Sequence, residues 1–343
     1  MGLDNIGVFD RNAQLPYGQH LEQADGTSWM AMYSLNLVRI AAELTTQDEA
    51  YTDIASKFFE HFIYIVGAMS NFGEHNEGLW DEQDGFFYDQ LRAPDGTVQK
   101  MRIRSIVGLI PLFATEVLDD ADIVNSPVFK DRMKWFENNR PDLASLVSRW
   151  GQKNAGGKHL FSLLRGYRMK CLLRYMLDEN EFLSPHGIRA LSKYHLDHPY
   201  HLGVDGHEFS IKYTPAESDS GLFGGNSNWR GPIWMPMNYL IVESLHKFHQ
   251  YYGDNYKVEC PTNSGNFLNL KQVADEIYSR LLKLFLQDEN GKRAVFGDHQ
   301  KLQTDPHFKD HLLFHEYFDG DNGRGLGASH QTGWTGLIGN CLL

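Results

Sequence analysis

Residues 29–69 read WMAMYSLNLVRIAAELTTQDEAYTDIASKFFEHFIYIVGAM, and this stretch gives the clearest indication of the fold. Apolar residues recur every three or four positions through its first half, at Trp29, Tyr33, Leu37, Ile40 and Leu44. After a short polar break, the same spacing continues from Tyr51 to Met69. Apolar residues at this period lie along one side of an α-helix, so the stretch predicts two neighbouring helices.

The helical period returns in four later segments, residues 106–117, 160–175, 241–252 and 273–284. Pro111 lies inside the first of them and predicts a kink there. Two start signals agree with a helical chain: Ser126 before Pro127, and the run Arg230, Gly231, Pro232. No series of alternating strands predicts a large sheet. The sequence therefore predicts an all-α protein built from helical hairpins around one core.

Composition excludes several classes of protein. The 343 residues carry a formal net charge of −12 with scattered acids, which argues against a nucleic-acid partner. The longest apolar runs fall far short of the roughly 20 residues that a membrane helix needs. Residues 1–20 show no basic start followed by an apolar stretch, and the three cysteines are widely separated. We therefore expect no membrane partner and a reducing, cytoplasmic location.

Four loop segments share acids beside aromatic residues, with glycine nearby: residues 2–33, 78–89, 223–240 and 315–334. Long connections rich in glycine and aromatic residues occupy residues 72–90, 195–230 and 295–332, and such length is typical of functional loops. A sugar suits this mixture, because its C–H faces pack on aromatic rings and its hydroxyls bind carboxylates, amides and guanidinium groups. Hydrolysis of a glycosidic bond requires two carboxyl groups.

Each of these residues also has a plain structural interpretation. Asp25 could serve only as a cap for the helix that follows it. The tryptophans at positions 80, 229, 234 and 334 could each be core residues. The similarity of the four loops favours a polar ligand site over this interpretation.

Two apparent metal motifs do not match known metal sites. His195, His198, His201 and His207 match no zinc pattern and are interpreted as loop histidines. Asp319 and Asp321 resemble the start of a calcium loop, but glycine occupies the third ligand position. Neither a metal nor another cofactor is predicted.

Four motifs together resemble glycoside hydrolase family 63: GLDN at 2–5, WDEQDGFFYD at 80–89, GGNSNWRGPIW at 224–234 and HEYFDGDNGRGLGASHQTGWTGL at 315–337. Some of them also resemble motifs of trehalases and glucoamylase-like enzymes. The resemblance implies an (α/α)6 toroid whose loops line the active site at one end. It also implies an inverting glycosidase that cleaves an α-glycosidic bond, such as that of an α-glucoside, without a metal in the reaction.

The resemblance also implies roles for particular residues. Asp4 is the expected general acid and Glu316 the expected general base, with Asp25 as the second candidate for the acid. The remaining expected substrate-binding residues are Trp29, Trp80, Asp81, Asp84, Trp229, Arg230, Trp234, Tyr317, His330 and Trp334. An acid catalyst needs a raised pKa, and the apolar neighbours Leu3, Ile6 and Phe9 could provide it.

The acid motif begins at residue 2, and about eight or nine helices are predicted where the resemblance implies about twelve. We therefore expect residues 1–343 to form a single toroid-type domain that lacks its first helices, with the missing part of the same enzyme as a partner. The expected substrate is an oligosaccharide or small glycoside. Two alternatives stay open: a non-catalytic, carbohydrate-binding fragment, and a trehalase- or phosphorylase-like enzyme.

Overall fold

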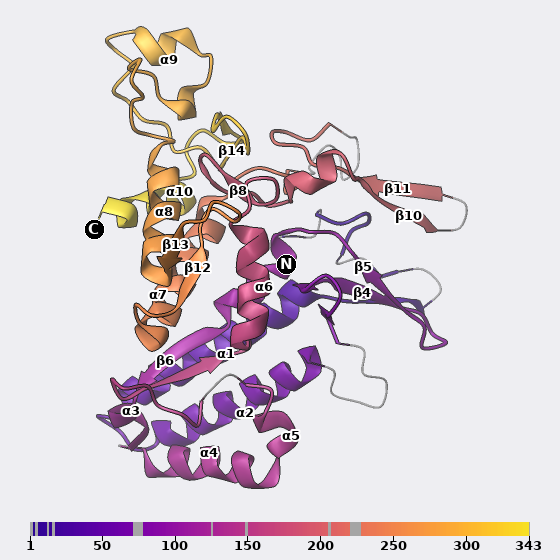
Figure 1. Cartoon of the computed structure of the whole chain (residues 1–343), viewed down its shortest axis with the longest axis vertical. Coiled ribbons are helices and arrows are strands. Elements are labelled where there is room, and N and C mark those ends of the chain that lie inside the picture. Colours follow the sequence, from indigo (N-terminus) through magenta and orange to yellow (C-terminus); the bar gives the residue numbers. More distant parts are fainter. Residues whose placement is uncertain are drawn as a thin grey trace.

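The structure is a computed structural model that describes residues 3, 6–11, 14–15, 18–70, 78–124, 126–147, 150–204, 207–219 and 228–342. Helices dominate its regular structure (Figure 1). The strands in these ranges pair into small antiparallel sheets of two or three strands. The chain is thus mostly helical, as the sequence predicted.

The first two helices form the hairpin predicted from residues 29–69. Helix α1 (Ala24–Leu44) and helix α2 (Tyr51–Met69) lie side by side (Figure 1). On its far side α2 packs against α4 (Pro127–Asn139) and α5 (Pro141–Ala144). Phe59 is fully buried there and makes ring contacts with aromatic residues at positions 129, 136, 150 and 161.

Helix α1 packs through a different face from its bulkiest apolar residues. Its buried side consists mainly of small residues, including Ala24, Ser28, Ala31, Ser34, Ala41 and Ala42. Tyr33, Leu37 and Ile40 are 48%, 37% and 54% exposed. Small side chains allow closely spaced helices, because the distance between helix axes depends on the residues at the contact. The apolar period predicted the helix correctly but not the face that packs within this chain.

The helix predicted over residues 106–117 is wrong. Two 3₁₀ turns, η2 (Ile106–Gly108) and η3 (Ile110–Phe113), are followed by strand β6 (Thr115–Asp119). Every residue from Ile106 to Leu118 is buried, so the segment is apolar all round and its period does not distinguish helix from strand. Pro111 lies at the start of η3, where its missing N–H is tolerated.

Strand β7 (Lys158–Ser162) pairs with β6 and contains the first residues of the helix predicted over 160–175. The helix itself, α6 (Gly166–Met176), begins later than predicted.

A second helical hairpin was predicted correctly. Helix α7 (Met235–Tyr252) packs against α8 (Leu270–Leu282), with the β12–β13 strand pair (Lys257–Glu259 and Phe267–Asn269) between them in sequence (Figure 1). Helix α7 begins after Trp234 with a proline in its first turn, later than the Pro232 start that the sequence predicted. Helix α8 begins with a capping box in which Asn269 and Gln272 exchange hydrogen bonds.

Short elements complete the described chain. The strand pairs are β1 (His20–Glu22) and β5 (Val98–Met101) on either side of β4 (Asp89–Arg92), β2 (Trp80–Asp81) with β3 (Phe86–Phe87), β8 (Leu183–Ser184) with β9 (Gly187–Ile188), β10 (Tyr200–Val204) with β11 (His207–Ile211), and β14 (Tyr317–Phe318) with β15 (Gly325–Leu326). The short helices are α3 (Asp120–Val124), η4 (Lys193–Leu196), η6 (Ala294–Phe296), α9 (Gln300–Thr304), α10 (Thr332–Thr335) and η7 (Gly336–Leu342). In Figure 1 the segment around α9 extends away from α8 at one end of the molecule. Across the described ranges, none of the helices combines the length and apolar character needed to cross a membrane.

Candidate functional site

A short backbone bridge joins the segment before α7 to the segment that contains Glu316. Ile233 and Phe318 exchange two hydrogen bonds, with N···O distances of 2.8 and 2.9 Å. Ile233 also bridges to Arg189 on its other side. Because Ile233 is fixed against Phe318, their neighbours Trp234 and Tyr317 are held close together.

Four aromatic residues gather around this bridge, and we call Trp229, Trp234, Tyr317 and Trp334 the aromatic cluster. Trp234 lies at its centre: its ring centroid is 3.9 Å from that of Trp229, 4.7 Å from that of Tyr317 and 5.5 Å from that of Trp334. Trp229, Trp234 and Tyr317 are buried, whereas Trp334 is 38% exposed. Trp334 therefore offers the largest open ring surface of the cluster.

Glu316 precedes the cluster residue Tyr317 and is half-buried. Its Oε2 accepts a hydrogen bond from the N–H of Ala328 at 3.2 Å, and its own N–H donates to the Ala328 carbonyl. No cation pairs with this carboxylate among the described residues. Gly327 has a φ of +66°, and a Cβ there would lie 2.7 Å from Oε2. Glycine is thus required at 327 both by its backbone conformation and by the close approach of Glu316.

Neighbouring polar groups at the site shift the pKa of the Tyr317 hydroxyl. Burial raises the pKa of Tyr317, a hydrogen bond with Asn228 lowers it, and the carboxylates of Glu217 and Glu316 raise it. Glu217 is an exposed third carboxylate that our sequence analysis did not single out. It belongs to none of the quoted motifs, and only its position shortly before the Trp229 motif could have indicated it.

Both acids of the loop that follows Tyr317 accept hydrogen bonds from protein groups. Asp321 accepts hydrogen bonds from Arg189 at 3.1 Å and from the Tyr213 hydroxyl at 3.0 Å. Asp319 Oδ1 accepts the N–H groups of Asp321 and Asn322. In the described ranges, no group of three or more His, Cys, Asp or Glu side chains could hold a metal ion.

The glycines of this loop make room for neighbouring protein atoms. A Cβ on Gly320 would lie 2.5 Å from the carbonyl oxygen of Gly231 and 2.7 Å from the Tyr213 hydroxyl. The loop can therefore lie directly against the segment that leads into α7.

Asp4, the expected acid, lies outside the described residues, but its neighbours are placed. Leu3 and Ile6 are buried at 4% and 2% exposure. The side chain of Arg230 donates from Nη2 to the carbonyl of Gly7 at 3.0 Å. The N-terminal motif is thereby attached to the segment that contains Trp229.

Arg11 anchors the same motif from the other side. Its guanidinium donates to the Leu3 carbonyl at 3.1 Å, to Asp25 at 3.0 Å and to Asp89 at 2.9 Å. Burial raises the pKa of Asp89 to about 6; Arg11 opposes this effect and the Asp25 charge adds to it. Asp25 itself is 1% exposed, and Gln23 rather than Asp25 is the N-cap of α1. In the structure, Asp25 forms a buried ion pair with Arg11.

Buried donors without partners lie beside the aromatic cluster. Nε of Arg230 and Nε1 of Trp234 are buried and find no acceptor within the part of the chain that the structure describes. Burial lowers the pKa of Arg230, and Asp219 partly offsets this. Unpaired buried donors cost free energy, and the described protein groups provide no acceptor for these two.

The second expected loop forms a unit of its own. Trp80 is buried against Phe87, with the Arg168 guanidinium 5.0 Å from its ring centroid. Asp81 accepts two backbone N–H groups and pairs with Arg102 at 3.0 Å. Asp84 accepts the hydroxyl of Tyr88 at 2.9 Å. No hydrogen bond, ion pair or ring contact within the described ranges joins these residues to Glu316.

Trp29 and His330 make no ring contact with the aromatic cluster in the described chain. Trp29 packs on Tyr33 and Phe113, while His330 is exposed. Of the expected substrate-binding residues, the structure therefore gathers Trp229, Trp234, Tyr317 and Trp334, with Arg230 adjoining them.

Comparison with known proteins gives two kinds of match. Residues 162–281 match the glycosyl hydrolase family 63 C-terminal domain. An uncharacterized protein of Saccharomyces cerevisiae is 52% identical over 98% of this chain. The "probable mannosyl-oligosaccharide glucosidase" of Schizosaccharomyces pombe is 29% identical over 51% of the chain, and the mannosyl-oligosaccharide glucosidase of S. cerevisiae is 29% identical over 35%.

The chain covers only part of each relative, namely 32%, 15% and 11% of their respective lengths. The family match includes α6 and α7 and most of α8, and it contains Trp229, Arg230 and Trp234. The resemblance to glycosyl hydrolase family 63 that the sequence predicted is thereby confirmed, and residues 162–281 of this chain correspond to the C-terminal domain of that family.

Proposed function

We propose that this chain carries the general base of an inverting glycoside hydrolase that cleaves an α-linked glucosyl residue. The observation that carries the proposal is Glu316: a half-buried carboxylate with no cation partner in the described chain, beside an aromatic cluster with one exposed tryptophan. The family match and the glucosidase names of two relatives support the choice of reaction.

In this proposal Asp4 is the general acid. The buried neighbours Leu3 and Ile6 favour an apolar setting for it, and such a setting raises a carboxyl pKa. Asp25 suits the role less well, because it is buried and paired with Arg11. The contact from Arg230 to Gly7 brings the N-terminal motif toward the segment that contains the aromatic cluster.

The chemistry requires the two carboxyl groups on opposite sides of the scissile bond. Asp4 gives its proton to the leaving oxygen, while Glu316 accepts a proton from the water that attacks the other face of the sugar. Because water displaces the leaving group from behind, the configuration at the anomeric carbon inverts. Room for that water requires carboxyl groups about 6.5–9.5 Å apart. Trp334 is the proposed platform for a sugar face.

We assign the two long hairpins, α1–α2 and α7–α8, to the ring of an (α/α)6 toroid. Support comes from the stripe of Met30, Tyr33, Leu37 and Ile40 on α1, which is large, apolar and exposed. A stripe of this kind marks a contact surface. We propose that further helices of a longer enzyme cover it, in line with the 32% share of the yeast relative that this chain spans.

The test is proton NMR of fresh product from a panel of α-glucosides, with Glu316→Gln as the inactive control. We expect the β-anomer of glucose to accumulate first. Early accumulation of the α-anomer would contradict inversion. If sugars raise the melting temperature without being hydrolysed, the non-catalytic binding alternative is supported. Products that change when phosphate is added would instead indicate a phosphorylase.

A further inference from the structure

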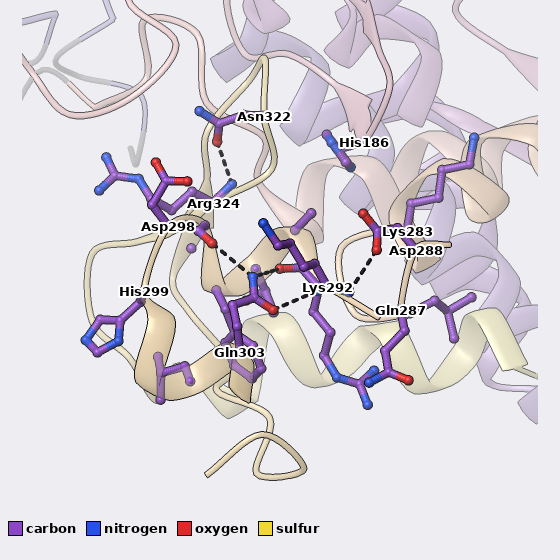
Figure 2. Close-up of a pocket in the computed structure, with 18 of the residues that line it drawn as sticks. His186, Lys283, Gln287, Asp288, Lys292, Asp298, His299, Gln303, Asn322 and Arg324 are labelled. Atoms are coloured by element: carbon purple, nitrogen blue, oxygen red, sulfur yellow. Dashed lines mark hydrogen bonds between the residues drawn. The ribbon is translucent and has the colours of Figure 1, made fainter. Parts of the chain in front are cut away.

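A cavity of about 1060 Å³ lies apart from the aromatic cluster. Its walls are the end of α8 with the following turn, the segment of η6 and α9, and the loop of residues 322–325 (Figure 2). Glu316 and the aromatic cluster do not line it. Ligand sites commonly have about 300–1,000 Å³, so this cavity could hold a molecule the size of a substituted sugar.

The charge of the cavity is opposite to that of the whole chain. Four cationic residues line it, namely Lys283, Lys292, Arg293 and Arg324, against the acids Asp288 and Asp298. The chain as a whole carries a formal charge of −12. A local excess of positive charge on an acidic protein attracts anions to this position.

Three of the cations are not neutralised by partners. Lys283, Lys292 and Arg324 make no ion pair with any residue that the structure describes. The carboxylate of Asp288 makes no ion pair with a side chain in the described ranges, and its Oδ1 accepts the backbone N–H groups of Asn290 and Lys292 at 2.9 and 2.8 Å. That carboxylate is used to close a turn.

Figure 2 shows Lys283 and Asp288 on one side of the cavity, Asn322 and Arg324 on the other, and Lys292 between them. Lys292 is therefore the most central of these cations, with one further cation on each side.

The walls are held in place before any ligand binds. Gln303 accepts the N–H of Arg293 at 3.0 Å and donates to the carbonyls of Arg293 and Gly297 at 2.9 Å each. The side chain of Arg324 lies over Gly297, where a Cβ would come within 2.7 Å of it. This preorganisation reduces the entropy that binding must remove.

His186 adds a polar group to the same wall. Its ring packs against Gly323, where a Cβ would lie 2.9 Å away, and its Nδ1 is buried without a partner in the described ranges. Burial and the nearby Lys283 charge lower the pKa of His186, so the ring stays neutral near pH 7 and can either donate or accept a hydrogen bond.

We propose that this cavity binds the phosphate group of a small phosphomonoester, with Lys283, Lys292 and Arg324 as its charge partners. A phosphomonoester carries a charge of about −1.5 to −2 near pH 7, which matches the excess of two positive charges in the lining. The guanidinium of Arg324 can donate two parallel hydrogen bonds to phosphate oxygens. A carboxylate carries only one charge and fits this cluster less well.

The test is isothermal titration calorimetry of the whole chain at low salt with glucose 6-phosphate. Glucose and glucuronate serve as neutral and carboxylate controls, and inorganic phosphate as the isolated group. We expect saturable binding of glucose 6-phosphate and phosphate that weakens as salt is added, and none of glucose. Lys292→Gln and Arg324→Gln should each weaken it about tenfold.

Lys271→Gln is the matched control, because Lys271 lies on α8 outside the cavity lining and pairs with Asp275 on an exposed surface. It should bind like the wild type. All three substituted residues are exposed, and unchanged thermal unfolding will show that each variant is folded.

The proposal is overturned if neither phosphate compound binds up to about 10 mM, if the Lys292 and Arg324 variants bind as the wild type does, or if glucuronate binds as tightly as glucose 6-phosphate. Binding is measured without any hydrolysis, so its failure would not touch the glycosidase proposal.

Discussion

Residues 78–89 and 315–334 have the same composition, with acids beside aromatic residues and glycine nearby, but the structure uses them differently. Asp81 in the first segment accepts hydrogen bonds from two backbone N–H groups and from Arg102. Glu316 in the second receives one N–H, from Ala328. Segments of similar composition can therefore hold a carboxylate with several protein partners or one with a single N–H donor in the described chain.

The electrostatics of Asp81 agree with a structural role. Burial alone would raise its pKa, but the N–H of Asp84 and the Arg102 guanidinium outweigh burial and lower it. A carboxylate stabilised in this way is a poor proton acceptor. The comparison therefore predicts that substitutions in the first segment change stability, and that substitutions at Glu316 change catalysis.

The largest expected effect is that of Glu316→Gln. Loss of the proposed general base should lower turnover of an α-glucoside by about 10²–10⁴-fold, because the amide cannot accept the proton of the attacking water. The melting temperature should change little, since the amide can still accept the Ala328 N–H. Initial-rate assays and thermal unfolding measure the two quantities. Retention of most activity would remove Glu316 from its assigned role.

Arg11→Met should cause the largest loss of stability. The substitution leaves Asp25 and Asp89 buried together without their shared cation, which should cost about 3–5 kcal/mol of unfolding free energy. Denaturant unfolding gives the value. Arg140→Met is the control, because Arg140 pairs with Asp142 at the surface and its loss should change stability far less than the loss of Arg11. Equal effects of the two variants would contradict the anchoring role of Arg11.

Asp81→Asn tests the other half of the comparison. The substitution removes the charge that pairs with Arg102 and weakens the hydrogen bonds from two backbone N–H groups. We therefore expect a loss of about 1–3 kcal/mol in unfolding free energy. Rates measured well below the melting temperature should stay close to those of the wild type. A strong fall in kcat with unchanged stability would show that Asp81 takes part in the reaction after all.

Sequence reasoning predicted the long helices and failed where burial is uniform. Residues 29–69, 241–252 and 273–284 form helices because each has a polar side that marks its period. Residues 106–117 are buried on all sides, so their apolar pattern is consistent with any regular structure. The packing face of α1 was missed for a related reason: alanine and serine make close helix contacts but contribute little to an apolar pattern.

At the site, the sequence predicted which motifs contain the aromatic cluster but not which carboxylates are already satisfied. The hydrogen bonds of Asp81 come from Gln83, Asp84 and Arg102, and only folding brings Arg102 to that position. Nor did the motifs indicate Glu217, whose charge acts on Tyr317 although the two residues are far apart in sequence. Partners that are distant in sequence separate a structural acid from an available one.

The smallest expected effect concerns His195, which lies in η4 and is satisfied at both ring nitrogens. Nε2 accepts the N–H of Arg104 and Nδ1 lies 2.9 Å from the carbonyl of His198, so the ring is held neutral. Burial lowers its pKa; the hydrogen bond to His198 opposes this, and the charges of Arg104 and His198 add to it. A folded pKa below the unfolded one means that the unfolded chain takes up a proton first as pH falls. The contribution to stability is therefore complete above about pH 6.5 and is lost as pH decreases below it.

His195→Gln removes this dependence, so the difference in unfolding free energy between wild type and variant should shrink by about 1 kcal/mol from about pH 7.5 to about pH 5.5. Denaturant unfolding at several pH values measures the difference. Leu196→Ala, on the same turn, removes no titratable group and should leave a difference that is independent of pH. A constant difference for His195→Gln would mean that the ring is free to take up a proton in the folded protein, against the two hydrogen bonds that hold it neutral.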